Sequence, residues 1–414
     1  MKILFATSSF KGGGITSYGK EVIENYSKDN DLSVLIGNDK ASPITTQGVK
    51  VYYNDCMDLS VKNAVRTIDL INNTIKPEVI LSSNAQIIPL IAPYLNDDIK
   101  IITVSHSLKY EAADMASVAH KHIDKIIAAS SSYNKQYMIH RFGIKDSSKI
   151  DIILNFVSEK EDAEEFIKEK KERDEIRLVF AGANSSSKSP DVVIKVVISL
   201  IKTGLPFKFY WMGYTDIPLR QYFSFLKVND IRDFVNDQRI IFPGRLPTRE
   251  DAVNLISSAN VFIAPSRREG CPMALLEAMR CGAIPIVADY GNANREIVRD
   301  GENGFMISHK DINAWVQRIE DIIKNHQRYH KYYDASYQTF TDRLCYKVWK
   351  EKMDAAIYAC GFNHVTRKKK VGVFCLRLRL LYFKMIKFVC RIEARLQEDV
   401  KVFLTFCKVK YRHP

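Results

Sequence analysis

Short apolar runs alternate with longer amphipathic stretches through the first part of the chain. Polar or helix-prone residues bound each run, and the runs are KILFA, LSVLIG, VKVYY, PEVILSS, KIITVSH, DKIIAAS and KIDIIL. An alternation of strand and helix patterns is typical of βα units around a parallel sheet. The first part of the sequence therefore predicts a doubly wound α/β domain.

The alternation is interrupted once and then resumes. Ser158 to Asp174 form a charged, helix-prone segment, which is followed by IRLVFAG, FKFYWMG, RIIFPG, NVFIAPS, AIPIVAD and GFMIS. We expect two Rossmann-like α/β domains. The expected divisions are residues 1–157 for the first domain, 158–175 for a linker, 176–335 for the second domain, 336–361 for a closing helix and 362–414 for a tail. Ligands of such folds bind outside the carboxyl ends of the strands.

The composition is that of a folded protein without a membrane-spanning segment. Of the 414 residues, 46% are hydrophobic and 26% are charged. No uncharged apolar run reaches the roughly 18 residues of a spanning helix. The start, MKILFATSS, has too short an apolar stretch for a secretory signal and is expected to be the first strand. The eight cysteines form no C-x-x-C pair, which fits a reducing cytoplasm.

The net charge of +13 is concentrated in the tail. Residues 362–414 hold fourteen Lys/Arg and three Asp/Glu, or +11, which leaves 47 basic and 45 acidic side chains, or +2, for the rest. A nearly neutral body argues against a nucleic-acid-binding core, whose basic patch would spread over the fold.

The tail also has the spacing of an amphipathic helix. Two stripes follow helical intervals: an apolar one of Phe374, Leu378, Leu381, Met385, Val389, Ile392 and Leu396, and a basic one of Arg377, Lys384, Lys387, Arg391 and Arg395. Such a helix favours peripheral attachment to an anionic membrane surface, here the inner face of the cell membrane. The alternative is a helix that packs on its own domain with its basic side chains solvated.

One acidic residue lies in an otherwise apolar segment. Pro272 to Met279 are apolar except for Glu277, at the spacing of a helix that is buried nearly all round. A buried carboxylate needs a partner, either a Lys or Arg inside the protein or the hydroxyl groups of a ligand such as a ribose. Glu269 and Gly270 lie in the loop before this helix, whose N-terminus favours phosphate. A nucleotide-sugar would satisfy both features.

This stretch resembles the signature of the group 1 (family 4) retaining glycosyltransferases, which have the GT-B fold of two Rossmann-like domains facing a cleft. The positions in register are Pro265-Ser266, Glu269-Gly270, Glu277-Ala278-Met279, Gly282, Pro285, Glu296 and Gly304. The resemblance extends over residues 1 to 360 and is strongest in the second half. It implies a donor on the second domain, an acceptor on the first, and a closing helix that crosses back to the first domain.

The resemblance also implies roles for individual residues. His106 would contact the donor sugar, Lys188 would neutralise the leaving diphosphate and Glu269 would lie near the transferred sugar, so these three are the expected catalytic residues. Glu277 would bind the ribose hydroxyls. The other expected donor contacts are the glycine loop Gly13 and Gly14, the nucleobase contacts Arg245 and Leu246, and the segment of Gly270, Cys271, Met273 and Ala274.

One position departs from the family pattern. Gly182 and Lys188 are in place, but Ala183 stands where the family has an Arg, and Ser189 replaces a second Gly. Losing one cation from a diphosphate site removes a charge-assisted hydrogen bond worth about 1.5–3 kcal/mol. Arg245, Arg267 or Arg268 could replace it, the donor could differ, or the activity could be lost.

The sequence thus predicts a glycosyltransferase that moves a sugar from a nucleotide-diphosphate sugar to a saccharide or lipid-linked acceptor with retention, in surface polysaccharide or glycolipid synthesis. The alternative is a catalytically silent GT-B-fold binding subunit at the membrane surface. We expect neither a cofactor nor a metal. Asp29-Asn30-Asp31 resembles a D-x-D metal motif but lies in a turn-like segment, and His120 and His122 would point to different faces of a helix.

Overall fold

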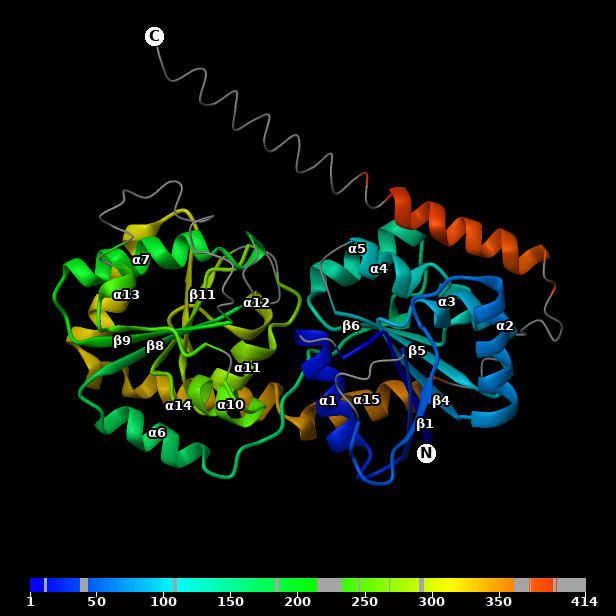
Figure 1. Cartoon of the computed structure of the whole chain (residues 1–414), viewed down its shortest axis with the longest axis horizontal. Coiled ribbons are helices and arrows are strands. Elements are labelled where there is room, and N and C mark those ends of the chain that lie inside the picture. Colours follow the sequence, from blue (N-terminus) through cyan, green and yellow to red (C-terminus); the bar gives the residue numbers. More distant parts are fainter. Residues whose placement is uncertain are drawn as a thin grey trace, which may run out of the picture.

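The computed structural model describes residues 1–10, 13–37, 44–106, 110–182, 186–213, 232, 234–244, 246–267, 269–289, 294–360, 372, 374–389 and 392. They form two α/β domains that lie side by side, each built on its own parallel sheet (Figure 1). The predicted fold class is therefore confirmed.

The first domain holds a seven-stranded sheet in the order β3-β2-β1-β4-β5-β6-β7, and all of its pairings are parallel. Its strands are β1 (Lys2–Thr7), β2 (Asp31–Ile36), β3 (Lys50–Tyr53), β4 (Val79–Ser83), β5 (Lys100–Ser105), β6 (Lys125–Ala128) and β7 (Ile150–Ile152). Each strand coincides, to within one residue at its ends, with part or all of one of the first seven apolar runs of the sequence. The chain order reverses between β1 and β4, which makes their loops the switch point of this sheet.

Helices cover both faces of this sheet because its strands are apolar on both sides. Ile3 and Phe5 belong to a core with α1 (Gly14–Tyr26), whereas Leu4 and Ala6 belong to a second core on the opposite face. The second core includes residues of α2 (Val61–Asp69), α3 (Ile87–Ile91), α4 (Tyr110–Ser117) and α5 (Ser132–Phe142). Short helical turns are η1 (Leu70–Ile75), η2 (Ala92–Tyr94), η3 (His120–His122) and η4 (Ser147–Lys149).

The second domain repeats the plan with a six-stranded parallel sheet in the order β10-β9-β8-β11-β12-β13. Its strands are β8 (Ile176–Ala181), β9 (Phe207–Met212), β10 (Ile240–Ile241), β11 (Val261–Ala264), β12 (Ile284–Ala288) and β13 (Phe305–Ile307). One face packs against α7 (Pro190–Lys202) and α13 (Ile312–Lys324), the other against α10 (Arg249–Ser257) and α11 (Met273–Met279). The remaining elements are η5 (Ser186–Lys188), α12 (Asn294–Ile297) and η6 (His326–Tyr329).

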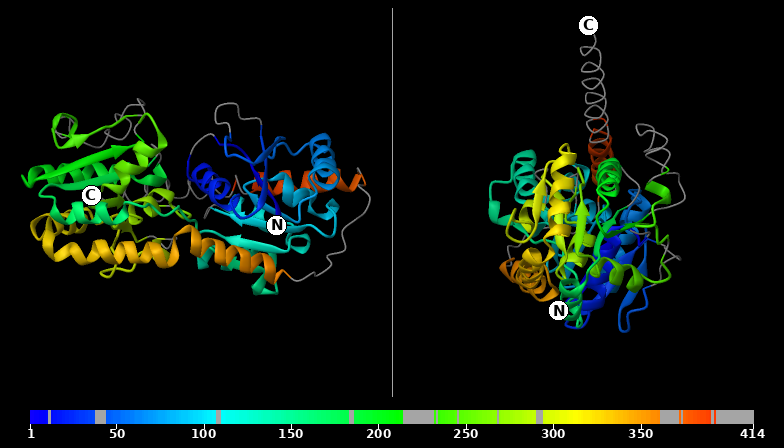
Figure 2. Two further views of the ribbon diagram at one scale, coloured as in Figure 1. Left: turned by 90° about the horizontal axis from the view of Figure 1, so that it is seen from below. Right: turned by 90° about the vertical axis from the view of Figure 1, so that its left-hand side faces the viewer.

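Two crossings connect the domains, and they lie next to each other. Residues 158–175 contain α6 (Ala163–Glu172), whose Ile167 and Lys170 are buried against the second domain. The chain returns through α14 (His330–Arg343) under the second domain and α15 (Tyr346–Ala359) under the first (Figure 2). The Val157 amide donates to Leu344 O at 3.3 Å, and Val157 pairs with Cys345 in a β-bridge. The return path therefore breaks into two helices at the point where it meets the outward path.

Residues 374–389 form a further helix, the tail helix, which lies over α3 on the first domain (Figure 1). Leu376, Leu380 and Phe383 are buried in the second core of that domain. Lys387 Nζ donates to Gln86 Oε1 at 2.9 Å. The helix therefore packs on its own domain through Leu376, Leu380 and Phe383, which belong to neither stripe traced in the sequence, and through Lys387 of the basic stripe. Arg391, Arg395 and Leu396 lie outside the described residues.

Among the helices in the described part of the chain, none combines the length and apolarity needed to cross a bilayer.

Candidate active site

Two charged side chains meet at the carboxyl ends of the second sheet. Lys188 ends the turn η5 after β8, and Glu269 lies in the loop after β11. The chain order reverses between these two neighbouring strands, so their loops flank the switch point where ligands of such folds bind. The Lys188 ammonium forms an ion pair with the Glu269 carboxylate, and the two side chains are 25% and 12% exposed. The structure thus brings two of the three predicted catalytic residues into contact.

Glycines allow Lys188 to lie close to the strand ends. A Cβ on Gly182 would lie 3.1 Å from Phe180 Cζ and 3.3 Å from Lys188 Cγ. Gly213 has a φ of 82° and lies directly against the Gly182 backbone. Because a larger residue at 182 would press on Lys188, the family glycine at this position has a steric role under the lysine.

Glu277 is a buried acid on α11. Only 7% of it is exposed, and it has no hydrogen bond or ion pair with the described residues. Burial raises the pKa of this carboxyl above its usual range, and the nearby Arg249 and Arg280 counteract that rise only in part. Arg249 instead pairs with Glu21 at 2.9 Å, and Arg280 Nη1 donates to Ser158 O at 3.1 Å. The internal ion pair that competed with the ligand role is thus absent from this part of the chain.

Glu21 is a residue that sequence reasoning missed. It is buried on α1, where one carboxylate oxygen accepts from the Ser158 amide at 3.0 Å and the other from Arg249 at 2.9 Å. These contacts tie the first domain to the crossing segment and to α10 of the second domain. The partners are 137 and 228 positions away, so no local pattern around Glu21 indicates them.

His106 is the first member of a hydrogen-bond chain that reaches the second domain. Its Nε2 lies 2.9 Å from Ser83 Oγ, and its Nδ1 lies 3.1 Å from Asn155 Oδ1. Asn155 Nδ2 donates to Cys271 O at 3.0 Å, which leaves Asn155 Oδ1 to accept. From these partners we assign a neutral ring with the proton on Nδ1. Burial lowers the pKa of His106 from the usual 6.5 to about 4, so the ring stays neutral at pH 7.

The glycine loop of the first domain meets the start of α11. Gly13 has a φ of 86° and precedes α1, and a Cβ on Gly14 would lie 3.7 Å from Met273 Cγ. The amides of Cys271, Met273 and Ala274 donate to no acceptor among the described residues. Three free donors at the mouth of a short helix, next to a glycine loop, form a surface suited to an anionic group.

Of the three arginines that could replace the missing one, the structure describes Arg267. Arg245, Arg268 and the substituted position Ala183 lie outside the described residues. The Arg267 amide donates to Ser187 O at 2.8 Å, which puts this residue beside Lys188, and its guanidinium pairs with Asp191 at 2.8 Å. Leu246, predicted at the nucleobase, is half-buried against the core that both domains share.

Two other motif positions serve packing and domain contact. A Cβ on Gly304 would lie 2.5 Å from Pro285 O, so these two positions are matched to each other by close approach. Glu296 accepts from the Ser132 amide at 3.1 Å and from Ser132 Oγ at 2.8 Å. This contact joins α12 of the second domain to the start of α5 in the first.

The described residues contain no group of His, Cys, Asp and Glu that could hold a metal ion. Asp29, from the rejected metal motif, accepts from Tyr346 Oη at 3.2 Å. His120 and His122 lie in the turn η3.

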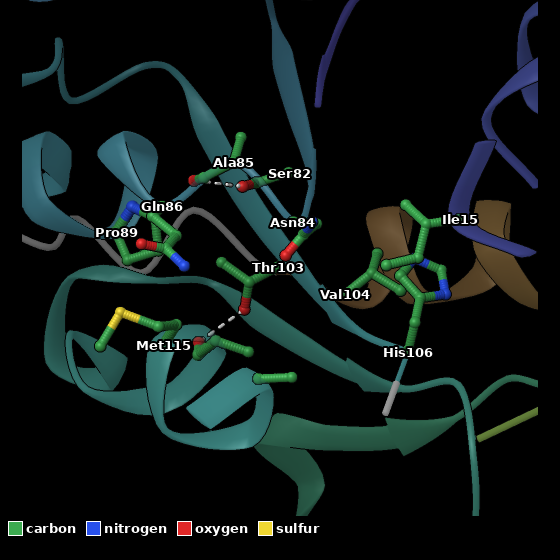
Figure 3. A pocket seen from close by; sticks show the side chains of 12 residues that line it. Ile15, Ser82, Asn84, Ala85, Gln86, Pro89, Thr103, Val104, His106 and Met115 are labelled. Atoms are coloured by element: carbon green, nitrogen blue, oxygen red, sulfur yellow. Dashed lines mark hydrogen bonds between the residues drawn. The ribbon is translucent and has the colours of Figure 1, made fainter. Parts of the chain in front are cut away.

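A cavity of ≈ 300 Å³ opens in the first domain at the carboxyl ends of β4 and β5. His106 and Ile15 lie at one end, and Gln86, Pro89 and Met115 lie at the other (Figure 3). Its wall mixes apolar side chains with a few polar groups, which is typical of small-molecule sites. His106 is linked by hydrogen bonds through Asn155 to Cys271 O, so the cavity adjoins the loop that carries the predicted donor contacts.

Residues 161–339 match the family model described as glycosyl transferases group 1. The UDP-Gal:alpha-D-GlcNAc-diphosphoundecaprenol alpha-1,3-galactosyltransferase of Escherichia coli is 32% identical over 94 residues, which is 23% of this chain and 23% of that protein. The glycogen synthase of Thermodesulfovibrio yellowstonii is 27% identical over 180 residues, 39% of this chain and 34% of that one. The chain thus covers only about a third or less of these relatives' own length.

Solved structures match over most of the chain. Anabaena HepE in complex with UDP and glucose aligns with a TM-score of 0.67 at 14% identity, covering 87% of this chain and 100% of that one. The lipopolysaccharide outer core galactosyltransferase WaaB in its apo form aligns with a TM-score of 0.61 at 19% identity, covering 87% and 99%. At these identities the likeness shows a shared fold, the GT-B arrangement of two Rossmann-like domains.

Proposed function

We propose that this chain, whose residues 161–339 match the group 1 glycosyl transferase model within a GT-B fold, transfers a sugar from a nucleotide-diphosphate sugar to a saccharide or lipid-linked acceptor. The observation that carries the proposal is Glu277, a buried carboxylate with no partner among the described residues. It lies one helical turn after Met273 and Ala274, on the helix that follows the loop of Glu269. A hydroxyl-binding acid beside an anion-binding surface is the combination that a nucleotide-sugar requires.

In this proposal the donor occupies the loops after β8 and β11. The ribose hydroxyls donate to Glu277, which satisfies its buried carboxylate. The diphosphate lies against the amides of Cys271, Met273 and Ala274 and takes over the Lys188 ammonium from Glu269. Arg267, next to Lys188, supplies the second cation that Ala183 lacks. Glu269, released from its ion pair, then accepts from a hydroxyl group of the transferred sugar.

The reaction we propose is a front-face displacement with retention. The bond between the anomeric carbon and the diphosphate oxygen breaks, and the acceptor hydroxyl adds to the anomeric carbon from the same face. Its proton passes to the departing phosphate oxygen. Lys188 and the amides stabilise the charge that develops on the diphosphate, in a site that domain closure screens from water. His106 stays neutral and acts as a positioning residue, since both of its ring nitrogens are engaged.

The cavity beside His106 is the proposed acceptor site. A place in surface polysaccharide or glycolipid synthesis, at the inner face of the cell membrane, fits the acceptor named for the Escherichia coli relative, a sugar diphosphoundecaprenol. The alternative, a silent binding subunit, rests on Ala183 alone.

Titration calorimetry with UDP and a panel of nucleotide-sugars, followed by turnover assays with those that bind, tests the proposal. Binding that is weakened by Glu277→Gln, together with sugar transfer that is crippled by Glu269→Gln, supports the enzyme. Binding without turnover by the parent chain or by Ala183→Arg supports the silent subunit. A panel that gives no binding at all refutes both.

A further inference from the structure

We propose that the tail helix docks the first domain onto an anionic bilayer through its outer face, and that it thereby holds the cavity beside His106 next to a membrane-borne acceptor. The statement about the acceptor rests on the proposed transfer reaction. The bilayer contact depends only on the helix itself.

The outer face of the tail helix gathers most of the exposed large hydrophobic residues of the described chain. Of thirteen exposed large hydrophobic residues, eight belong to this helix and its continuation, and they are Phe374, Leu378, Leu381, Tyr382, Met385, Phe388, Val389 and Ile392. Leu378 and Met385 are 51% and 56% exposed, and helical geometry puts them opposite the buried Leu380 and Phe383. A helix that simply covered its domain would turn polar residues outward. This helix is apolar on both sides, so its outer side has a partner that excludes water.

The charge of the segment identifies that partner as anionic lipid. Residues 361 to 392 contain no acidic residue, whereas Arg377 and Lys384 are exposed on the flank between the buried and the outer face. Basic side chains at the flank of an apolar face reach lipid headgroups while the face itself enters the acyl boundary. A second copy of this chain fits less well, because two such faces would oppose like charges with no acidic side chain of the helix to meet them.

A direct contact links the helix to the cavity. Lys387 Nζ donates to Gln86 Oε1 at 2.9 Å, and Gln86, which is 7% exposed, lines the cavity at the end away from His106 (Figure 3). The cavity therefore extends from His106, which is linked through Asn155 to the loop of Cys271, to Gln86, which is hydrogen-bonded to the tail helix. A helix whose outer face lies in the headgroup layer would place this end of the cavity about one helix diameter, roughly 10–12 Å, from the lipid surface. An acceptor carried on a lipid would reach the cavity there.

Sedimentation of the full chain with phosphatidylcholine vesicles, with and without phosphatidylglycerol, tests the docking. We expect binding to the anionic vesicles that weakens with salt. Leu378→Glu combined with Met385→Glu should reduce it at least tenfold, and Arg377→Gln combined with Lys384→Gln should reduce it by about fivefold per charge. The matched control is Tyr358→Glu with Val65→Glu, two exposed apolar residues on α15 and α2, which should bind within twofold of the parent.

Melting temperature and UDP affinity should be equal in the parent and in all these variants, because every substituted side chain is exposed and lies outside the donor loops. Equal vesicle binding by the parent and the Leu378→Glu/Met385→Glu variant overturns the docking. A parent that dimerises in light scattering while this variant is monomeric assigns the face to a second copy and also overturns it.

Transfer to a polyprenyl-diphosphate sugar in the vesicles, compared with the same headgroup on a short water-soluble chain, tests the acceptor. The Leu378→Glu/Met385→Glu variant should lose transfer to the acceptor in the vesicles and keep transfer to the water-soluble acceptor. Equal loss of both contradicts the proposed placement. Vesicle binding without turnover on either acceptor contradicts the transferase and leaves the docking standing.

Discussion

Replacing Glu277 by Gln should have opposite effects on stability and on binding. The carboxylate is 7% exposed and lacks a hydrogen bond to the described residues. Burial disfavours the ionised carboxylate, Gln has the same shape without the charge, and Arg249 and Arg280 offset part of the cost of the charge, so we expect a stability gain of about 1 kcal/mol. A gain of about 1 kcal/mol corresponds to a rise in melting temperature of roughly 2–4 °C for a domain of this size. The same change removes a charged acceptor for the ribose hydroxyls and should weaken UDP binding about 10–100-fold.

The stability gain should also depend on pH. Because burial raises the pKa of Glu277, the folded protein holds this proton at pH values where the unfolded chain has lost it. The wild type therefore loses stability as pH rises above the usual value for a Glu, whereas the Gln variant does not. Thermal melting across pH 4 to 8 and calorimetric titration with UDP measure the two effects. A variant that is less stable than the wild type at pH 7 and binds UDP equally well would refute the reasoning, because Glu277 would then be an internally satisfied structural acid.

Three further changes test other parts of the site. Lys188→Ala should reduce the rate of sugar transfer about 10–100-fold in a turnover assay, because it removes a charge-assisted hydrogen bond to the diphosphate. The exposed control Lys310→Ala should leave the rate unchanged. Equal rates for Lys188→Ala and the wild type would show that Lys188 is not part of the site. Ala183→Arg should strengthen UDP binding about tenfold or more in calorimetry if the diphosphate lies beside Lys188, and an unchanged affinity would place the diphosphate elsewhere. Because the pKa of His106 is about 4 in the folded protein, the wild type should lose stability relative to His106→Gln as pH falls from 6.5 to 4; a melting-temperature difference that is constant over that range would show a His106 that titrates normally.

The sheets could be predicted from the sequence because their signal is local. Strands such as β1 and β11 are short apolar runs between polar segments, and their alternation with helix-like stretches is typical of parallel α/β sheets. The Glu269–Gly270 and Glu277 positions were also visible, since an acid in an apolar helix contradicts its surroundings. Lys188 was expected in the site because Gly182 and Lys188 match the pattern of the family that the sequence resembles.

What the sequence could not supply are the contacts between distant segments. The ion pair of Glu21 with Arg249 and the path from His106 through Asn155 to Cys271 join residues that no periodicity relates. The charged segment around Ile167 and Lys170 was expected to be a linker, and in the structure it contains a helix whose burial depends on the second sheet.

The tail shows the same limit in a different way. Its apolar stripe was correctly traced at helical spacing, but spacing alone does not tell which face the domain covers. Leu376, Leu380 and Phe383 are buried because they pack into the second core of the first domain, next to α3. The described residues of the traced apolar stripe, on the opposite side of the helix, are exposed.

The central claim, that a nucleotide diphosphate binds where α11 begins, is tested most directly by a crystal structure of the chain soaked with UDP. The account predicts the diphosphate within hydrogen-bond distance of Lys188 Nζ and of the amides of Cys271, Met273 and Ala274, with the ribose hydroxyls on Glu277. A loop that stays filled by its own side chains, with Glu277 paired to Arg249 or Arg280 and UDP bound elsewhere or not at all, would contradict it.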